Sequence, residues 1–196
     1  MSLIIFKVLG LMILFIFVFF VSDFRNKEGM ISLVDKKWIL KIKLFYTIPI
    51  LLYFYIVLSL EDIQIYDYIA FILTLSGTFI VVKAKKDMGK YHTWAGHKLN
   101  TTRMITRGIY SFIRHPLYTG INIFILGALV ISINHNPFNI YLSLIAFMIV
   151  VFIMAFLVMM ALKESQFLLE EFGEEYIRYR SQVHAFLPTS KFYFEE

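Results

Sequence analysis

The sequence IYLSLIAFMIVVFIMAFLVMMAL, at positions 140–162, contains no charged side chain and ends directly before Lys163 and Glu164. The hydrocarbon core of a bilayer is about 30 Å thick, and a helix needs roughly 20 apolar residues to cross it. An uncharged apolar segment of this length therefore predicts a transmembrane helix with a polar boundary at Lys163.

Upstream of this segment lie four more predominantly apolar stretches, at about residues 3–21, 44–60, 65–82 and 116–133. We start the fourth at Pro116, because proline suits the first turn of a helix. The first stretch has no basic residue before it and no small-residue cleavage site after it, so we expect a retained helix rather than a signal peptide. The sequence predicts an all-α, polytopic integral membrane protein with about five transmembrane helices and one domain over residues 1–196.

The composition agrees with a membrane protein. Hydrophobic residues make up 59% of the chain and the mean hydropathy is +0.72, whereas soluble domains are roughly 45–50% apolar. The chain contains no cysteine, which excludes disulfides, zinc–thiolate sites and thiol nucleophiles.

The basic residues fall on one side of this five-helix arrangement. Residues 23–43 hold six Lys and Arg, residues 83–117 hold eight, and residues 163–196 hold four, which leaves only Lys7 of the nineteen. Loops rich in Lys and Arg remain in the cytoplasm. We therefore predict a multi-pass cell-membrane protein with its N-terminus outside and its C-terminus in the cytoplasm.

Two short outer turns connect neighbouring helices, at residues 61–64 and 134–139. They predict one antiparallel hairpin of the second and third helices and another of the fourth and fifth. Beyond the last membrane segment, apolar residues recur every three or four positions, which predicts a cytoplasmic amphipathic helix over about residues 164–183. We expect it to lie on the membrane surface or on the loop 83–117.

A dense polar and aromatic cluster, Gly108–Gly120, lies at the cytoplasmic mouth of the fourth helix. Arg114 and His115 directly precede Pro116 and so occupy the cap region, where free N–H groups and the positive end of the helix dipole attract a carboxylate or phosphate. The alternative is that these residues only face lipid headgroups, as basic and aromatic side chains often do at this depth.

Glu164, at the inner end of the fifth helix, is the second candidate. Because a short outer turn joins the fourth and fifth helices, their inner ends are neighbours, and Glu164 is expected near Arg114 and His115. The alternative is a solvated glutamate at a helix end. His92, His97, His135 and His184 are spread over loops, and no cluster offers three metal ligands, so we predict no metal site.

The run TRGIYSFIRHPLYTG, residues 106–120, resembles the signature of the isoprenylcysteine carboxyl methyltransferase family and of the related phospholipid methyltransferases. A second similar block contains Glu164, LLEEFGEEY at 168–176, and Leu187–Pro188. One helical hairpin separates the two blocks, as in the family. The resemblance extends from about Met88 to Pro188, and it implies a five-helix core, S-adenosylmethionine as methyl donor and no metal.

Carried over by position, the resemblance implies a cytoplasmic cofactor-binding region made by Thr102, Arg103, Met104, Ile105, Tyr110, Arg114, His115, Pro116, Leu117, Tyr118 and Glu164. It also implies catalytic roles for His115 and Glu164. The chemistry of the ligand agrees, because a helix N-terminus with basic residues suits a carboxylate and Glu164 suits a cation.

Two positions depart from the family pattern. Enzymes that methylate prenylcysteine carry an arginine for the substrate carboxylate one turn before the glutamate, where this chain has Met160. The residue after the glutamate is Ser165, where the family commonly has a second acid. The missing arginine predicts poor activity on simple prenylcysteine analogues.

We therefore predict an S-adenosylmethionine-dependent methyltransferase that acts on an amphiphilic small molecule or lipid from the inner leaflet, of isoprenylcysteine-carboxylate or phospholipid type. No nucleic acid is expected as a partner. Two alternatives remain open at this point: a membrane reductase of the sterol-reductase type with a nicotinamide cofactor, and a non-enzymatic membrane protein that retains the motif.

Overall fold

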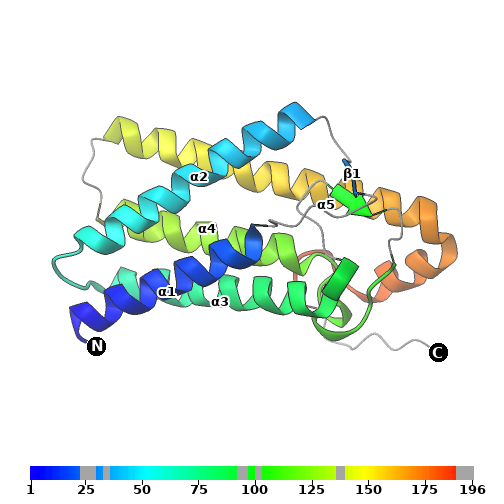
Figure 1. Cartoon of the computed structure of the whole chain (residues 1–196), viewed down its shortest axis with the longest axis horizontal. Helices are drawn as coiled ribbons and strands as arrows, with labels where there is room; N and C mark the ends of the chain where they lie inside the picture. The colour runs from blue at the N-terminus through cyan, green and yellow to red at the C-terminus, as the bar shows by residue number, and fades with distance from the viewer. Residues whose placement is uncertain (23–29, 33–35, 92–96, 100–102, 136–139, 189–196) are drawn as a thin grey trace.

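A computed structural model of the chain describes residues 1–22, 30–32, 36–91, 97–99, 103–135 and 140–188. The elements in chain order are α1 (Leu3–Val21), β1 (Met30–Ser32), α2 (Lys36–Ser59), α3 (Ile65–Met88), η1 (Gly89–Tyr91), β2 (His97–Leu99), η2 (Gly108–Ser111), α4 (Pro116–Asn134) and α5 (Ile140–Gln182). The five α-helices lie alongside one another in an elongated bundle (Figure 1).

The two ends of the bundle differ in character. One end, here called the turn end, holds the start of α1, the connection from α2 to α3 and the connection from α4 to α5 (Figure 1, left). The other, here called the basic end, holds the two strands, η2, the start of α4 and the continuation of α5 (Figure 1, right). The described parts of the three segments rich in Lys and Arg adjoin the basic end.

The predicted all-α membrane fold is confirmed. Among the described residues, α1, α3, α4 and α5 are long and apolar enough to cross a membrane, and the apolar part of α2, Leu44–Ser59, is shorter. Helix α1 has the predicted bounds, and α4 begins at Pro116 as predicted and ends one residue late.

Three helices extend beyond their predicted membrane segments. Helix α2 begins at Lys36, α3 continues to Met88, and α5 runs without a gap into the region predicted as an amphipathic helix. The prediction of one amphipathic helix over 164–183 is wrong, because Gly173 (φ 51°) breaks it. After Gly173 the chain turns back toward the bundle, as the orange ribbon does in Figure 1.

Helices α3 and α4 form the closest seam of the bundle. A Cβ atom on Gly77 would lie 2.6 Å from the Gly120 carbonyl oxygen, and one on Gly127 would lie 2.9 Å from the Ala70 carbonyl oxygen. Small residues let membrane helices approach backbone to backbone. Gly120 and Gly127 thus serve the packing of α4 on α3.

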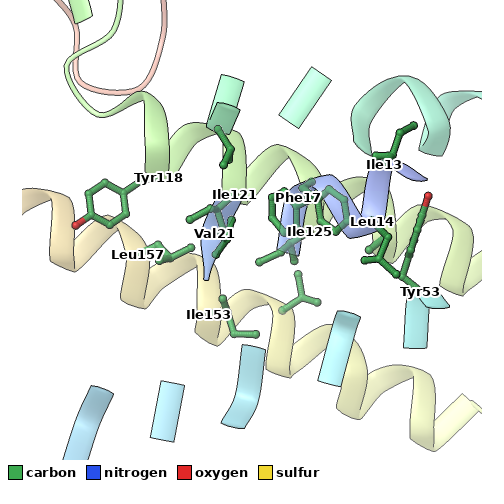
Figure 2. Close-up of a cluster of buried hydrophobic side chains, with 14 of the residues drawn as sticks. Ile13, Leu14, Phe17, Val21, Tyr53, Tyr118, Ile121, Ile125, Ile153 and Leu157 are labelled. Carbon is green, nitrogen blue, oxygen red and sulfur yellow. The ribbon is translucent and has the colours of Figure 1, made fainter. Parts of the chain in front are cut away.

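The apolar core lies where α1 crosses the other helices. Figure 2 shows side chains of α1, α2, α4 and α5 meeting there, among them Phe17, Tyr53, Ile125 and Ile153. The rings of Phe17 and Phe124 stack with their centroids 3.6 Å apart.

Of the two predicted helix hairpins, only the second is seen. Helices α4 and α5 pack together as predicted. Helix α2, however, packs on α1, α4 and α5, so α2 and α3 do not form a hairpin paired along its length.

Strands β1 and β2 were not predicted from the sequence. They pair antiparallel, with Met30 opposite Leu99. They join the connection after α1 to the connection after α3 at the basic end. This pairing holds together two loops that are far apart in the sequence.

Candidate active site at the basic end of α4 and α5

Backbone hydrogen bonds hold His115 at the start of α4. It is the N-cap of α4, its carbonyl accepts from the Thr119 N–H at 3.1 Å, and its own N–H donates to the Ala185 carbonyl at 2.9 Å. Pro116 follows at the first helical position, which has no N–H to satisfy. The imidazole is therefore held at the mouth of α4 by bonds on both sides.

The imidazole of His115 faces two consecutive residues of α5. Its Nε2 lies 2.7 Å from Ser165 Oγ, and its Nδ1 lies 3.5 Å from Glu164 Oε2. The His115 side chain is 3% exposed and that of Glu164 is 34% exposed. A carboxylate can only accept, so this orientation favours the proton on Nδ1 and leaves Nε2 to accept from the serine hydroxyl.

Tyr110, on η2, brings a third polar group to this end of the bundle. The residue is buried, and its hydroxyl is enclosed without a hydrogen-bond partner among the described residues. Burial raises the pKa of the Tyr110 phenol well above its ordinary value of 10.0, and the negative charge of Glu164 raises it further. The hydroxyl thus stays protonated and available as a donor.

A contact from α3 fixes the position of η2. Asp87 Oδ2 accepts from the Ile109 N–H at 2.7 Å, and Asp87 Oδ1 pairs with Lys83 Nζ at 2.6 Å. Gly108 has φ +65° and no room for a side chain, because a Cβ atom there would overlap the Asp87 carboxylate. Only glycine meets both conditions, and Tyr110 follows two residues later.

The segment after Gly173 folds back over the start of α4. Tyr179 Oη donates to the Tyr110 carbonyl at 2.6 Å, and Arg114 Nη1 donates to Tyr176 Oη at 3.1 Å. The Arg114 N–H also donates to the His184 carbonyl at 2.9 Å. The C-terminal segment therefore packs on the loop before α4, one of the two positions expected for the amphipathic helix.

Most of these groups lie in a region that matches known proteins. Residues 66–175 match a family model described as phospholipid methyltransferase, which is more than half of the chain. The chain belongs to the phospholipid methyltransferase family. It is also 30% identical over 132 residues to proteins from Oryza sativa subsp. indica and subsp. japonica, each named "Probable protein-S-isoprenylcysteine O-methyltransferase". The aligned part is 66% of this chain and 65% of each relative, just under two thirds of their length.

The part of the chain that matches the phospholipid methyltransferase family includes both His115 and Glu164. The structure brings these two residues together, and the ring of Tyr118 lies 6.0 Å from that of His115. Pro116, Leu117 and Tyr118 are buried, and Figure 2 shows Tyr118 beside Leu157 of α5.

The upstream residues predicted for this family's cofactor segment contact other residues of the basic end. Arg103 is exposed and lies over the ring of Tyr91 at 5.7 Å. Met104 packs against the cluster of Tyr176, Tyr179 and Val183, and Ile105 packs against the main core. Thr102 lies outside the described residues.

Two features of the site were missed from the sequence. Ser165 was read only as a departure from the family, yet its hydroxyl is the shortest side-chain contact of His115. The close bonds of residues 184–186 to the start of α4 were not foreseen either. The sequence signal for this fold-back was the glycine at position 173, between two amphipathic stretches. In the structure Gly173 has a positive φ.

Proposed function

We propose that this protein is an S-adenosylmethionine-dependent methyltransferase that acts on an amphiphilic acceptor at the cytoplasmic face of the membrane. The observation that carries the proposal is the meeting of His115 with Glu164 and Ser165 at the basic end. This contact brings together the block 106–120 and the block that contains Glu164, in a chain that belongs to a methyltransferase family.

The residues at this end fit the proposed cofactor. Glu164 is partly exposed and suits a cation, whereas α4 has no side-chain cap, so its first N–H groups suit a carboxylate. Tyr110 Oη and Arg114 Nε are buried polar atoms with no partner among the described residues. Such atoms are uncommon in folded proteins and are often satisfied by a ligand or water.

S-adenosylmethionine supplies, when bound, a methyl group on a positively charged sulfur. The contribution of the protein is to align an acceptor with that methyl group and to exclude water. Glu164 would hold positive charge and His115 would be held in place by Ser165. A carboxylate acceptor needs no base, whereas an amine or phenol must lose a proton, which we assign to His115.

The cytoplasmic assignment of the basic end is part of this proposal. It follows from the sequence, because 18 of the 19 Lys and Arg residues fall in segments 23–43, 83–117 and 163–196, and only Lys7 lies elsewhere. A reporter fused after Glu196 should then read as cytoplasmic, and one inserted at residues 134–136 as external. Reporters on the same side would contradict it.

The acceptor class is constrained by Met160. This residue is fully buried on α5, one turn before Glu164, and offers no cation for the carboxylate of a prenylcysteine. We expect slow methyl-ester formation on a simple prenylcysteine analogue, measured by incorporation of a labelled methyl group. Rapid ester formation would contradict this restriction.

Cofactor binding by the purified full-length protein tests the proposed function. We expect saturable binding of S-adenosylmethionine in equilibrium dialysis, competed by S-adenosylhomocysteine, without any acceptor present. Binding of NADPH in place of S-adenosylmethionine would favour the reductase alternative, and binding of neither would contradict an enzymatic role.

A further inference from the structure

His115, the residue to which we assign the proton of the acceptor, is enclosed. Its side chain is 3% exposed, and the rings of Tyr118 and Phe186 lie 6.0 and 5.8 Å from its imidazole ring. Both ring nitrogens also face a residue of α5, because Nδ1 lies 3.5 Å from Glu164 and Nε2 lies 2.7 Å from Ser165. An acceptor that enters the site therefore has no direct route to the imidazole.

Ser165 links the enclosed imidazole to the more open part of the site. The residue is half-buried and follows Glu164, whose side chain is 34% exposed. A serine hydroxyl can donate one hydrogen bond and accept two. Because Nδ1 of His115 carries the proton toward Glu164, Nε2 accepts from the serine hydroxyl. Among the described residues Ser165 Oγ makes no other side-chain hydrogen bond, so its lone pairs remain able to accept a proton.

We propose that Ser165 is a catalytic residue that relays a proton from the methyl acceptor to His115. As Ser165 Oγ takes the proton of an N–H or O–H group of the acceptor, it gives its own proton to Nε2. The lone pair left on the acceptor forms the bond to the methyl carbon, and the carbon–sulfur bond of the donor breaks with its electron pair on sulfur. The imidazolium that results lies beside the Glu164 carboxylate, which compensates its charge.

The relay matters only for an acceptor that has a proton to lose. An amine or a phenol must lose one, whereas a carboxylate is already ionised at neutral pH and needs no base. A serine that only supported the fold would serve both kinds of acceptor alike. The inference rests on the proposed function, because it takes the donor and the acceptor to meet beside Ser165.

Two probe acceptors test the relay in the purified full-length protein. The amine probe is N-methyl phosphatidylethanolamine, and the carboxylate probe is a prenylcysteine analogue, on which each variant is compared with the equally slow wild type. Ser165→Ala should lower the kcat for the amine about 100-fold, within the range of general-base catalysis, and change the kcat for the carboxylate less than about twofold. KM and S-adenosylmethionine affinity should stay unchanged.

Two further variants separate the hydroxyl from the fold. Ser165→Thr keeps a hydroxyl at the same position and should retain most of the activity on the amine. Ser181→Ala removes an exposed hydroxyl that donates to the Arg178 carbonyl at 2.8 Å, and it should change neither activity. An equal loss on both probes in Ser165→Ala, or no loss on the amine, would overturn the relay. So would a wild type that is inactive on the amine probe.

A second measurement needs no turnover. Nitrogen-15 NMR of histidine-labelled protein distinguishes a ring nitrogen that bears a proton from one that does not, and the His115 signals are those lost in His115→Gln. We expect Nε2 to bear no proton at neutral pH, and its signal to shift in Ser165→Ala but not in Ser165→Thr. A proton on Nε2 would overturn the relay. A wild type that binds no S-adenosylmethionine would instead overturn the proposed function, even with the expected spectrum.

Discussion

Two histidine–carboxylate pairs lie at opposite ends of α4, and they are built differently. At the turn end, His135 Nε2 lies 2.8 Å from Asp67, whose side chain is fully buried. At the basic end, His115 is the buried partner, and Glu164 lies 3.5 Å away and is 34% exposed. The buried group is the acid in one pair and the base in the other.

The hydrogen-bonding sites of the Asp67 carboxylate are occupied by several donors. It accepts from the Gln64 N–H at 2.7 Å, from Asn134 Nδ2 at 3.3 Å and from His135, and it belongs to the capping box of α3. Glu164 has only the long contact to His115 among the described residues. A saturated acid ties α3 to α4, whereas an accessible acid is free to bind a ligand.

Removal of the turn-end acid should cost the most stability. Asp67→Ala leaves the donors of Gln64, Asn134 and His135 without their buried acceptor, so we expect the free energy of unfolding to fall by about 3 kcal/mol. S-adenosylmethionine affinity should stay unchanged in the folded fraction. Unfolding in detergent measures the loss, with the exposed Glu61→Ala in the same turn as control; an equal effect of both variants would refute the structural role.

At the basic end, Gly108→Ala should affect both stability and binding. The positive φ and the overlap with Asp87 should together cost about 2 kcal/mol, and the displaced η2 should weaken cofactor binding. Gly89→Ala is the matched control, because Gly89 also has positive φ but nothing lies within 4 Å of its added Cβ. Calorimetry should find weaker binding only for Gly108→Ala, and equal binding by the two variants would contradict the role of η2.

Tyr110→Phe should change stability only at alkaline pH. The hydroxyl has no partner in the described part of the chain, so the effect at pH 7 should stay within about 0.5 kcal/mol. Because the folded-state pKa of Tyr110 is raised, the unfolded chain loses its proton first, and the wild type loses stability as pH rises above 10.0. Thermal unfolding from pH 8 to 11 should show a smaller loss for the phenylalanine variant, and parallel curves would contradict this.

The sequence was sufficient to predict what depends on local pattern. An apolar run of membrane length predicted the bounds of α1, and a proline at the first helical position predicted the start of α4. The short turn between α4 and α5 then placed Glu164 near His115, and their contact was expected on that basis alone. These features need only spacing along the chain and the thickness of a bilayer.

Features that depend on tertiary contacts were not predictable in this way. His135 was dismissed as a loop histidine, because its partner Asp67 is 68 residues away. The fold-back after Gly173 depends on where Tyr176 and Tyr179 find buried partners. Strand β1 pairs with a segment almost seventy residues later, and three residues are too few for a recognisable pattern.

The comparison between the two acids is tested most directly at Glu164. Glu164→Gln keeps the shape and removes the charge, so we expect S-adenosylmethionine binding, measured by calorimetry, to weaken by roughly tenfold to a hundredfold, the effect of one charge-assisted bond. The free energy of unfolding should change by less than about 0.5 kcal/mol. Glu174→Gln, on an exposed residue of the fold-back segment, should change neither. Equal cofactor affinity in the wild type and Glu164→Gln would contradict the role that we assign to the accessible acid.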